Sequence, residues 1–303
     1  MRLEAALRDL DDADPRVRAQ AADALGRADD GDRDAAGEAL ARAVDDKHAA
    51  VRYSALLSLG ELGASERMAC VVERLDDGEP LVREAATIAL GQLGAAALAE
   101  NAADRVEAAW VALDGALAAP ASEVRFQAVA SLAEIDAVRA APRVRSSLAD
   151  PDPKVRAQAA AALGDARDRD SADLLVKALG DRPTGGPLGE LRHEAALALA
   201  RIGDRRCVPA LLEALSQADQ ALDAATALAE LGVRDDALAK EALAREVTRF
   251  FGDPLVKVHA AEALARAGDP RGRAHLTKAA RARRDDVRGL AESVLLNLGK
   301  LGS

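Results

Sequence analysis

The sequence is poor in aromatic residues and nearly free of cysteine. Aromatic side chains make up 2% of the 303 residues, so the core must be built from aliphatic side chains and alanine. The two cysteines, Cys70 and Cys207, are too few for a disulfide framework and lack metal-ligand spacing, which indicates a reducing cytoplasm. The first ten residues contain no continuous apolar segment, and no apolar run approaches membrane length. Neither a signal peptide nor a membrane span is therefore expected.

Strand signals are also missing, because polar and apolar residues do not alternate over any sustained stretch. The chain contains instead a repeated motif, Val-Arg-x-x-Ala-Ala-x-Ala-Leu-Gly, in nine recognisable copies. The steps between copies run from 29 to 42 residues, and such a period with helical content predicts a helical array. The second motif position falls at Arg18, Arg52, Arg83, Arg125, Arg156, Arg192, Ala221, Lys257 and Arg288.

The clearest copy, residues 150–164, has the pattern of a helix start followed by a helix face. Asp152 is a candidate N-cap, and Pro153 suits the first helical turn because its missing N–H needs no partner there. Val155, Ala159 and Leu163 recur at helical spacing, and an alanine-rich stripe predicts close packing against other helices. This motif helix is termed helix B.

Each helix B follows a second segment with apolar helical periodicity, termed helix A. One such hairpin cannot bury its own apolar face, whereas nine stacked hairpins share a continuous core. The segments predicted as A helices include residues 3–10, 35–44, 68–75, 106–117, 174–179, 208–215 and 238–247.

The repeats resemble HEAT repeats, specifically the short variety of phycobilisome bilin lyases and many bacterial proteins. The resemblance covers essentially the whole chain. It rests on the A–B alternation, on the Asp-Pro entries at residues 14–18 and 150–156, and on the Leu-Gly exits at 25–26, 90–91 and 163–164. It implies an all-α fold, a right-handed α-solenoid of about nine helical hairpins in a single array over residues 1–303. The approximate repeats are 1–29, 30–63, 64–94, 95–136, 137–167, 168–203, 204–232, 233–268 and 269–303.

The motif arginines are expected to form a structural ladder. An aspartate lies six residues before the arginine in four repeats, so a carboxylate in the inter-helix turn can pair with a donor on helix B. HEAT-like proteins use such pairs along the array. Repeats four and six to nine lack this aspartate, so the ladder should weaken toward the C-terminus. The four pairs are Asp12/Arg18, Asp46/Arg52, Asp77/Arg83 and Asp150/Arg156.

Helix positions one and five residues after the motif arginine are expected to point away from the core. In HEAT-like arrays the B helices line the concave face, so apolar residues at these positions could form a groove for a partner. The alternative is that curvature buries the strip as ordinary core. The predicted partner-binding residues are Tyr53, Leu57, Ile88, Phe126, His193, Leu197, Leu222 and Val258.

Three irregularities interrupt the repeats. The Gly- and Pro-rich stretch 180–189 is either a binding loop or a tolerated insertion. Trp110, in the long fourth repeat, is expected to fill the core. Phe250 and Phe251 are expected to fill the convex layer at the end of the eighth A helix.

Charge is distributed unevenly along the sequence. Residues 1–150 contain 28 acidic and 17 basic residues and would repel polyanions. A basic cluster near the C-terminus could dock nucleic acid, but a solvated terminal face is favoured because the chain carries −10 overall and lacks interleaved aromatic residues. The cluster comprises Arg266, Arg271, Arg273, Lys278, Arg281, Arg283 and Arg284.

Enzymatic chemistry finds little support in the sequence. No Cys/His cluster, glycine-rich phosphate loop or nucleophile elbow occurs, and no catalytic residue, cofactor or metal site is expected. The pair His193-Glu194 resembles the His-Glu motif of deoxyhypusine hydroxylase, a HEAT-like di-iron enzyme. A lone pair cannot complete two iron sites, because the other B helices lack the motif.

The favoured hypothesis is a cytoplasmic, non-catalytic scaffold or adaptor that binds a helix or an extended segment of another protein on the concave B-helix face. Glu61, Glu134 and Arg201 would orient the partner. A subunit like a bilin lyase or a chaperone is the enzyme-class alternative, on fold analogy alone. A nucleic-acid-binding protein that uses the basic cluster is a further alternative. The oligomeric state and the identity of the partner stay open.

Overall fold

The computed structural model describes residues 3–180 and 190–300. This part of the chain is built from helices and contains no strand, which confirms the predicted all-α solenoid. Residues 1–162 form one compact unit and residues 163–303 a second. They are termed unit 1 and unit 2, and each is described by itself. The prediction of one continuous array over both stays a prediction.

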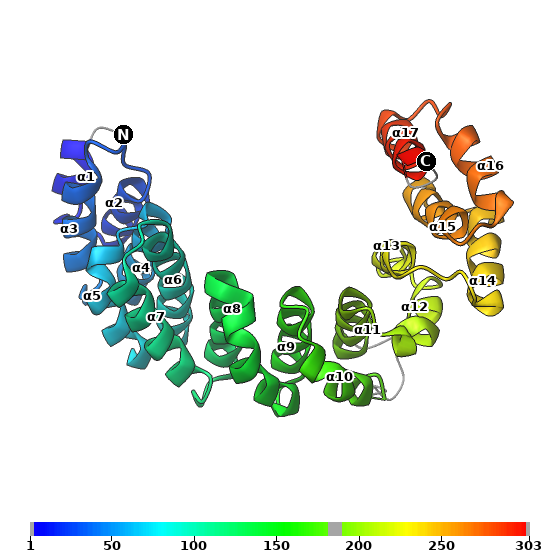
Figure 1. Cartoon of the computed structure of the whole chain (residues 1–303). Helices are drawn as coiled ribbons and strands as arrows, with labels where there is room; N and C mark the ends of the chain where they lie inside the picture. Colours follow the sequence, from blue (N-terminus) through cyan, green and yellow to red (C-terminus); the bar gives the residue numbers. More distant parts are fainter. Residues whose placement is uncertain (1–2, 181–189, 301–303) are drawn as a thin grey trace. The chain divides into compact units, whose positions relative to one another are not determined.

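Unit 1 is a stack of helical hairpins in which A and B helices alternate (Figure 1). The B helices α2, α4, α6 and α8 pack against one another in sequence, and each contacts its own A helix. The helices are α1 (Leu3–Asp9), α2 (Pro15–Leu25), α3 (Arg33–Ala43), α4 (Ala49–Leu62), α5 (Met68–Val72), α6 (Pro80–Ala99), α7 (Ala103–Ala116) and α8 (Ser122–Val144), with 3-10 turns η1 (Ser65–Arg67), η2 (Glu73–Asp76) and η3 (Arg145–Ala149). Helix α9 (Pro153–Asp165) begins in unit 1 and ends in unit 2.

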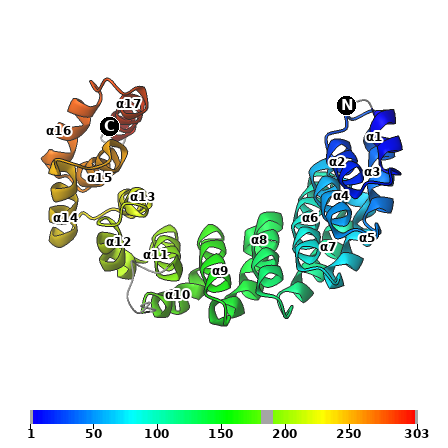
Figure 2. The ribbon, with the colours of Figure 1, turned by 180° about the vertical axis from the view of Figure 1, so that it is seen from behind.

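Unit 2 repeats the same arrangement (Figure 2). Its B helices α11, α13, α15 and α17 pack in sequence, and each contacts the A helix that precedes it. The helices are α10 (Ala172–Ala178), α11 (Glu190–Ile202), α12 (Val208–Ala214), α13 (Ala221–Leu231), α14 (Ala237–Thr248), α15 (Pro254–Arg266), α16 (Pro270–Ala279) and α17 (Asp285–Lys300), with 3-10 turns η4 (Arg169–Ser171) and η5 (Arg205–Cys207). Of the Gly/Pro-rich stretch 180–189, only Gly180 belongs to the described residues.

Helix α8 contains two repeat helices joined at a kink. Asp136 has φ −161° and ψ 98°, which interrupts the helix, and its Oδ1 accepts the N–H of Arg139 at 3.0 Å. Asp136 therefore starts a new helical segment, because it supplies an acceptor to a free helical N–H. The residues before it form helix B of the fourth repeat, and those after it form helix A of the fifth.

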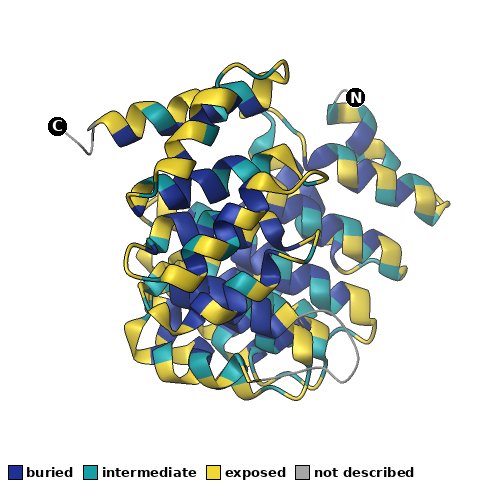
Figure 3. Ribbon diagram, turned by 90° about the vertical axis from the view of Figure 1, so that its right-hand side faces the viewer, coloured by how far each residue is buried: buried dark blue, intermediate teal, exposed yellow. Residues whose placement is uncertain are grey.

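Within each unit, the core is a column of leucines surrounded by alanines. The motif leucine lies seven residues after the second motif position and is at most 1% exposed in each of the first eight copies. Buried positions gather where neighbouring helices meet, and the turns are exposed (Figure 3). Burying one leucine stabilises a fold by about 2 kcal/mol, so this column is a major source of stability. The leucines are Leu25, Leu59, Leu90, Leu132, Leu163, Leu199, Leu228 and Leu264.

Two sequence predictions about apolar segments have different outcomes. Trp110 is buried, with the guanidinium carbon of Arg139 4.0 Å from its ring centroid, which confirms that it fills the core. The prediction that no segment approaches membrane length is wrong, because α6 is long and apolar enough to span a membrane. More than half of that stretch is buried against neighbouring helices, which is the pattern of a core helix.

Several helices begin at an Asp-Pro pair. Asp152 Oδ1 accepts the N–H of Lys154 at 2.8 Å, which confirms the predicted N-cap of α9. Each such cap contributes about 1 kcal/mol because it satisfies a helical N–H that has no partner within the helix. The same bond, to the residue two positions on, occurs at Asp14, Asp253 and Asp269.

Three of the motif arginines of unit 1 connect their own repeat to the following one. In each connection the Nε and Nη2 groups donate to the two carboxylate oxygens of an aspartate in the turn of the following repeat, at 2.7–2.9 Å. The prediction that the arginine pairs with the aspartate side chain of its own repeat is therefore wrong. These connections are termed rungs, and they are Arg18–Asp46, Arg52–Asp77 and Arg125–Asp150.

The six-residue spacing seen in the sequence corresponds to a different bond. Arg52 Nη1 donates to the main-chain carbonyl oxygen of Asp46 at 2.9 Å, so the arginine contacts the backbone of its own turn. The Asp46 carboxylate also accepts the N–H of His48 at 2.8 Å. Each rung aspartate thus receives three N–H donors, two from a side chain and one from the backbone. In unit 2 the motif arginine Arg192 pairs instead with Glu213 on α12, at 2.8 Å.

Acid should weaken unit 1 through these rungs. The hydrogen bonds from Arg18 and Arg125 hold the pKa values of Asp46 and Asp150 below the ordinary range. A depressed carboxyl pKa contributes stability that is complete above the unfolded-state pKa of about 4 and is lost as the pH falls through the folded-state pKa. Urea unfolding of unit 1 should therefore give a nearly constant free energy between about pH 7 and pH 5 and a decline below about pH 4. In an Asp150→Asn variant, the free energy of unfolding should decline less steeply below about pH 4. An equal decline in the variant and the wild type would show that the rung aspartates do not cause the loss of stability in acid.

Candidate functional site

Four of the predicted partner-binding residues lie on the B helices of unit 1. Tyr53 and Leu57 belong to α4, Ile88 to α6 and Phe126 to α8. Tyr53 is 37% exposed, and the other three are half-buried. They occupy equivalent helix positions on helices that pack side by side, so they lie on one side of the unit. These four residues are termed the B-helix face. That they bind a partner stays a prediction.

Carboxylates without partners surround the B-helix face. Glu61 on α4, Glu84 on α6 and Glu134 on α8 have no ion pair or hydrogen bond to their side chains among the residues that the structure describes. Glu84 was absent from the predicted site, although it occupies the same motif position as Tyr53 and Phe126. Unpaired carboxylates at an apolar face favour a partner that brings positive charge.

The net charge of unit 1 is consistent with this pattern. Residues 1–162 contain 29 acidic and 19 basic residues, a formal net charge of −10. The remaining residues contain 22 of each sign and are formally neutral. The whole negative balance of the chain therefore belongs to unit 1, where it would accelerate association with a cationic segment.

The remaining predicted site residues lie in unit 2, where most of them are buried. Val258 is fully buried, and His193 and Leu197 are 8% exposed, so the prediction that these positions point into solvent is wrong. The alanine-rich helices α11, α13 and α15 approach closely enough for each helix to cover the flank of the next. Leu222 remains exposed.

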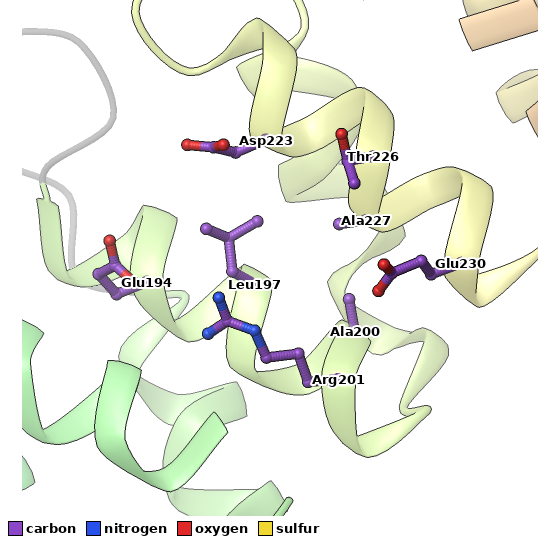
Figure 4. A pocket seen from close by; sticks show the side chains of 8 residues that line it. All are labelled: Glu194, Leu197, Ala200, Arg201, Asp223, Thr226, Ala227 and Glu230. Carbon is purple, nitrogen blue, oxygen red and sulfur yellow. The ribbon is translucent and has the colours of Figure 1, made fainter. Parts of the chain in front are cut away.

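A polar pocket of about 280 Å³ lies between α11 and α13 (Figure 4). Leu197 projects into the gap between the two helices. Arg201 forms an ion pair with Asp165 at 3.3 Å, and the hydroxyl of Thr226 donates to the carbonyl oxygen of Leu222 at 2.9 Å. The hydroxyl is thus bonded within its own helix rather than to a base that could activate it. The lining residues are Glu194, Leu197, Ala200, Arg201, Asp223, Thr226, Ala227 and Glu230.

The His193-Glu194 pair is placed at the edge of this pocket. His193 Nε2 lies 3.7 Å from Asp223 Oδ2, and burial lowers the pKa of His193 despite the nearby carboxylate. Burial also raises the pKa of Glu194. Across the described part of the chain, no group of three or more His, Cys, Asp or Glu residues is arranged to hold a metal ion.

The prediction for the phenylalanine pair is wrong. Phe250 and Phe251 are 88% and 83% exposed, with ring centroids 4.7 Å apart in an edge-to-face arrangement. They follow the end of α14 at Thr248 and lie in the connection to α15, so no helix side carries them into a core.

Three of the seven side chains of the basic cluster form ion pairs within unit 2, whereas Lys278, Arg281 and Arg283 form none among the residues that the structure describes. Arg271 binds Asp269 and Glu241, and Arg266 binds Glu262. Paired guanidinium groups offer less charge to phosphate, because binding would have to displace the carboxylates. The pairing therefore reduces, but does not remove, the positive charge that the cluster offers to nucleic acid.

Comparisons with known families identify the repeats. A family model described as HEAT repeats matches residues 2–91, 37–112 and 111–186. A model described as the PBS lyase HEAT-like repeat matches residues 191–217. No curated protein matches the chain.

Solved structures with the same fold are distant in sequence. The YibA protein of Escherichia coli is 21% identical with a TM-score of 0.64, over 88% of this chain and 93% of that one. An engineered protein is 20% identical with a TM-score of 0.51, over 99% of both chains. The complex of CpcE and CpcF of phycocyanin lyase from Nostoc sp. is 21% identical over 98% and 95%, but its TM-score of 0.47 carries no argument. Identities this low show the fold alone.

Proposed function

Because the chain belongs to the HEAT-repeat family, we propose that it is a non-catalytic scaffold or adaptor that binds a segment of another protein on the B-helix face of unit 1. The observation that carries this proposal is the combination of partly exposed apolar side chains with unpaired carboxylates on three adjoining helices. Such a face would gain free energy both from burying apolar area and from ion pairs formed at its rim.

The partner segment that fits is amphipathic and basic. Its apolar residues would bury Tyr53 and Phe126, the two aromatic residues of the face. Its lysines or arginines would meet Glu61, Glu84 and Glu134. Since charges at a rim act mainly on association rate and salt dependence, capture should weaken as salt is raised.

The contribution of the apolar residues to binding is tested by capturing partner proteins from lysate of the source organism. The double variant Tyr53→Glu, Phe126→Glu should lose the partner, because two buried negative charges would replace apolar contacts at the centre of the face. Bound proteins are identified and quantified by mass spectrometry. The matched control is Val138→Glu, at an exposed apolar position of unit 1 outside the face, which should retain the partner. Equal capture by the wild type and the double variant would place the partner site elsewhere.

A second pair of variants tests the charges separately from the apolar residues. Glu61→Lys with Glu134→Lys should reduce capture of the same partner by about tenfold or more, since each contact becomes repulsive. Thermal unfolding should be nearly unchanged, because neither carboxylate has a partner in the described structure. Tyr53→Ala with Phe126→Ala should likewise leave the melting transition nearly unchanged, and a large loss of stability would identify these rings as core.

The two alternatives from the sequence stay hypotheses. A subunit like a bilin lyase or a chaperone would need to bind an open-chain tetrapyrrole, so the absence of any spectral change on titration would count against it. Nucleic acid would meet a basic cluster in which Arg266, Arg271 and Arg284 are already paired with carboxylates, and a polyanion would also be repelled by unit 1.

A further inference from the structure

The three rungs of unit 1 share one geometry. In each, one aspartate carboxylate accepts the arginine Nε–H, the arginine Nη2–H and the backbone N–H two residues after the aspartate. The last of these bonds measures 2.8 Å at His48, 3.0 Å at Glu79 and 2.8 Å at Asp152. The turn of a HEAT hairpin in this chain is therefore a carboxylate-binding device with three convergent donors.

The fourth repeat has the same turn without the carboxylate. Its sequence, Ala119-Pro120-Ala121, corresponds to Asp150-Pro-Asp152 in the fifth repeat. Arg125 Nη1 donates to the carbonyl oxygen of Ala119 at 2.9 Å, just as Arg156 Nη1 donates to that of Asp150 at 2.8 Å. The backbone of the turn is thus preserved, and only the acidic side chain is missing.

Three donors are left without an acceptor as a result. Arg83, the arginine that precedes this turn, uses Nη1 to bind the carbonyl oxygens of Asp77 and Gly78. Its Nε and Nη2 groups, and the N–H of Ala121, make no hydrogen bond to any residue that the structure describes. These are the donors that bind the aspartate in the intact rungs.

A cavity of about 780 Å³ lies where the missing carboxylate would be. It is lined by Arg83, Ala119 and Ala121, and otherwise by mainly apolar residues that include Val72, Leu75 and Val111. Pockets for small molecules commonly have 300–1,000 Å³ and a few convergent polar groups in an apolar lining. The only other charged residues of the lining are Asp76, which is exposed, and Asp77, which is already bound by Arg52.

We propose that this cavity binds a small monocarboxylic acid with an apolar body, whose carboxylate takes the position of the missing rung aspartate. The carboxylate accepts from Arg83 Nε, Arg83 Nη2 and the Ala121 N–H, and the apolar body contacts Val72, Leu75 and Val111. Asp76, Asp77 and the net charge of unit 1 disfavour a second negative charge, which argues against dicarboxylates and acidic protein segments. The site is separate from the B-helix face.

Calorimetric titration with octanoate tests the proposal. Octanoate should bind the wild type at one saturable site, and 1-octanol, which has the same chain without a carboxylate, should bind at least about tenfold more weakly. Ala119→Asp supplies the carboxylate within the chain and should weaken octanoate binding by at least about tenfold, because the three donors become occupied. The same variant should melt at a higher temperature than the wild type, since it completes a rung.

Two further variants distinguish octanoate binding in this cavity from nonspecific octanoate binding elsewhere on the protein. Arg83→Gln should also weaken octanoate binding. The control Arg143→Gln changes an exposed arginine on α8 and should leave octanoate binding unchanged. Unaltered octanoate binding by Ala119→Asp would overturn the proposal, as would the absence of saturable binding to the wild type. Equal affinities for octanoate and 1-octanol would show that the arginine takes no part.

Discussion

Replacing Asp77 by asparagine is expected to destabilise unit 1 by about 3 kcal/mol, because the change leaves a guanidinium group without its carboxylate. The Asp77 side chain is 4% exposed and that of Arg52 is 14% exposed, so water cannot replace the lost partner easily. Asparagine has nearly the same size and retains an oxygen that can accept the N–H of Glu79. The loss in free energy of unfolding therefore measures the contribution of the Arg52–Asp77 ion pair, because side-chain packing and the turn are preserved.

Asp12→Asn is the matched control for this loss. Asp12 occupies the same turn position in the first repeat, where its carboxylate accepts the N–H of Asp14 at 2.7 Å. No arginine in the described part of the chain pairs with the Asp12 carboxylate, so its replacement should cost at most about 0.5 kcal/mol. The single tryptophan, Trp110, is buried in unit 1 and reports urea unfolding of that unit by fluorescence. Equal losses in the two variants would show that the rung contributes little.

Replacing Gly272 by alanine should destabilise unit 2 by about 2 kcal/mol or more, although alanine ordinarily favours a helix over glycine by about 1 kcal/mol. A Cβ atom at Gly272 would lie 2.4 Å from the carbonyl oxygen of Ala261 and 2.4 Å from the backbone nitrogen of Ala265. Both contacts are to the backbone of α15, which cannot move aside as a side chain can. Helix α16 would have to separate from α15 and would lose buried contacts.

Gly289→Ala in α17 provides the comparison, because a Cβ atom there would have no neighbour within 4 Å. Its expected effect is a stabilisation of about 0.5–1 kcal/mol from helix propensity alone. Urea unfolding followed by far-UV circular dichroism should show a transition at a lower urea concentration in Gly272→Ala than in the wild type. Urea unfolding followed by Trp110 fluorescence should have the same midpoint in both proteins. A neutral or stabilising Gly272→Ala substitution would show that the two helices separate at little cost.

Local patterns in the sequence were sufficient to predict the helices of the repeats. The motif leucine, the alanine stripe and the Asp-Pro start at Asp152 each act within one helix, so periodicity and capping rules reveal them. The rungs were misassigned for the opposite reason. Arg52 and the aspartate of its own repeat are six residues apart, but Asp77 binds its side chain from the next repeat, and spacing within one repeat cannot specify a contact between two.

The candidate site was predictable to a similar degree. Helix geometry placed Tyr53, Leu57 and Phe126 on the outer side of their helices, where they are at least partly exposed. The same geometry failed at Val258, because burial there depends on how closely α13 and α15 approach, which is a tertiary property. The unpaired carboxylate of Glu84, and the Nε and Nη2 groups of Arg83 that have no acceptor in the described structure, also required the structure. The absence of an aspartate at position 119 was visible in the sequence, but its effect on Arg83 was not.

The missing rung also bears on the mechanics of unit 1. Charged clamps tie the turn of the second repeat to the first, the third to the second and the fifth to the fourth. Between the third and fourth repeats, no such clamp occurs among the residues that the structure describes, and this edge of the stack depends on the packing of α6 against α8. Resistance to bending is therefore uneven along the unit. A force that pulls the turns of neighbouring repeats apart would separate the third and fourth repeats before the others.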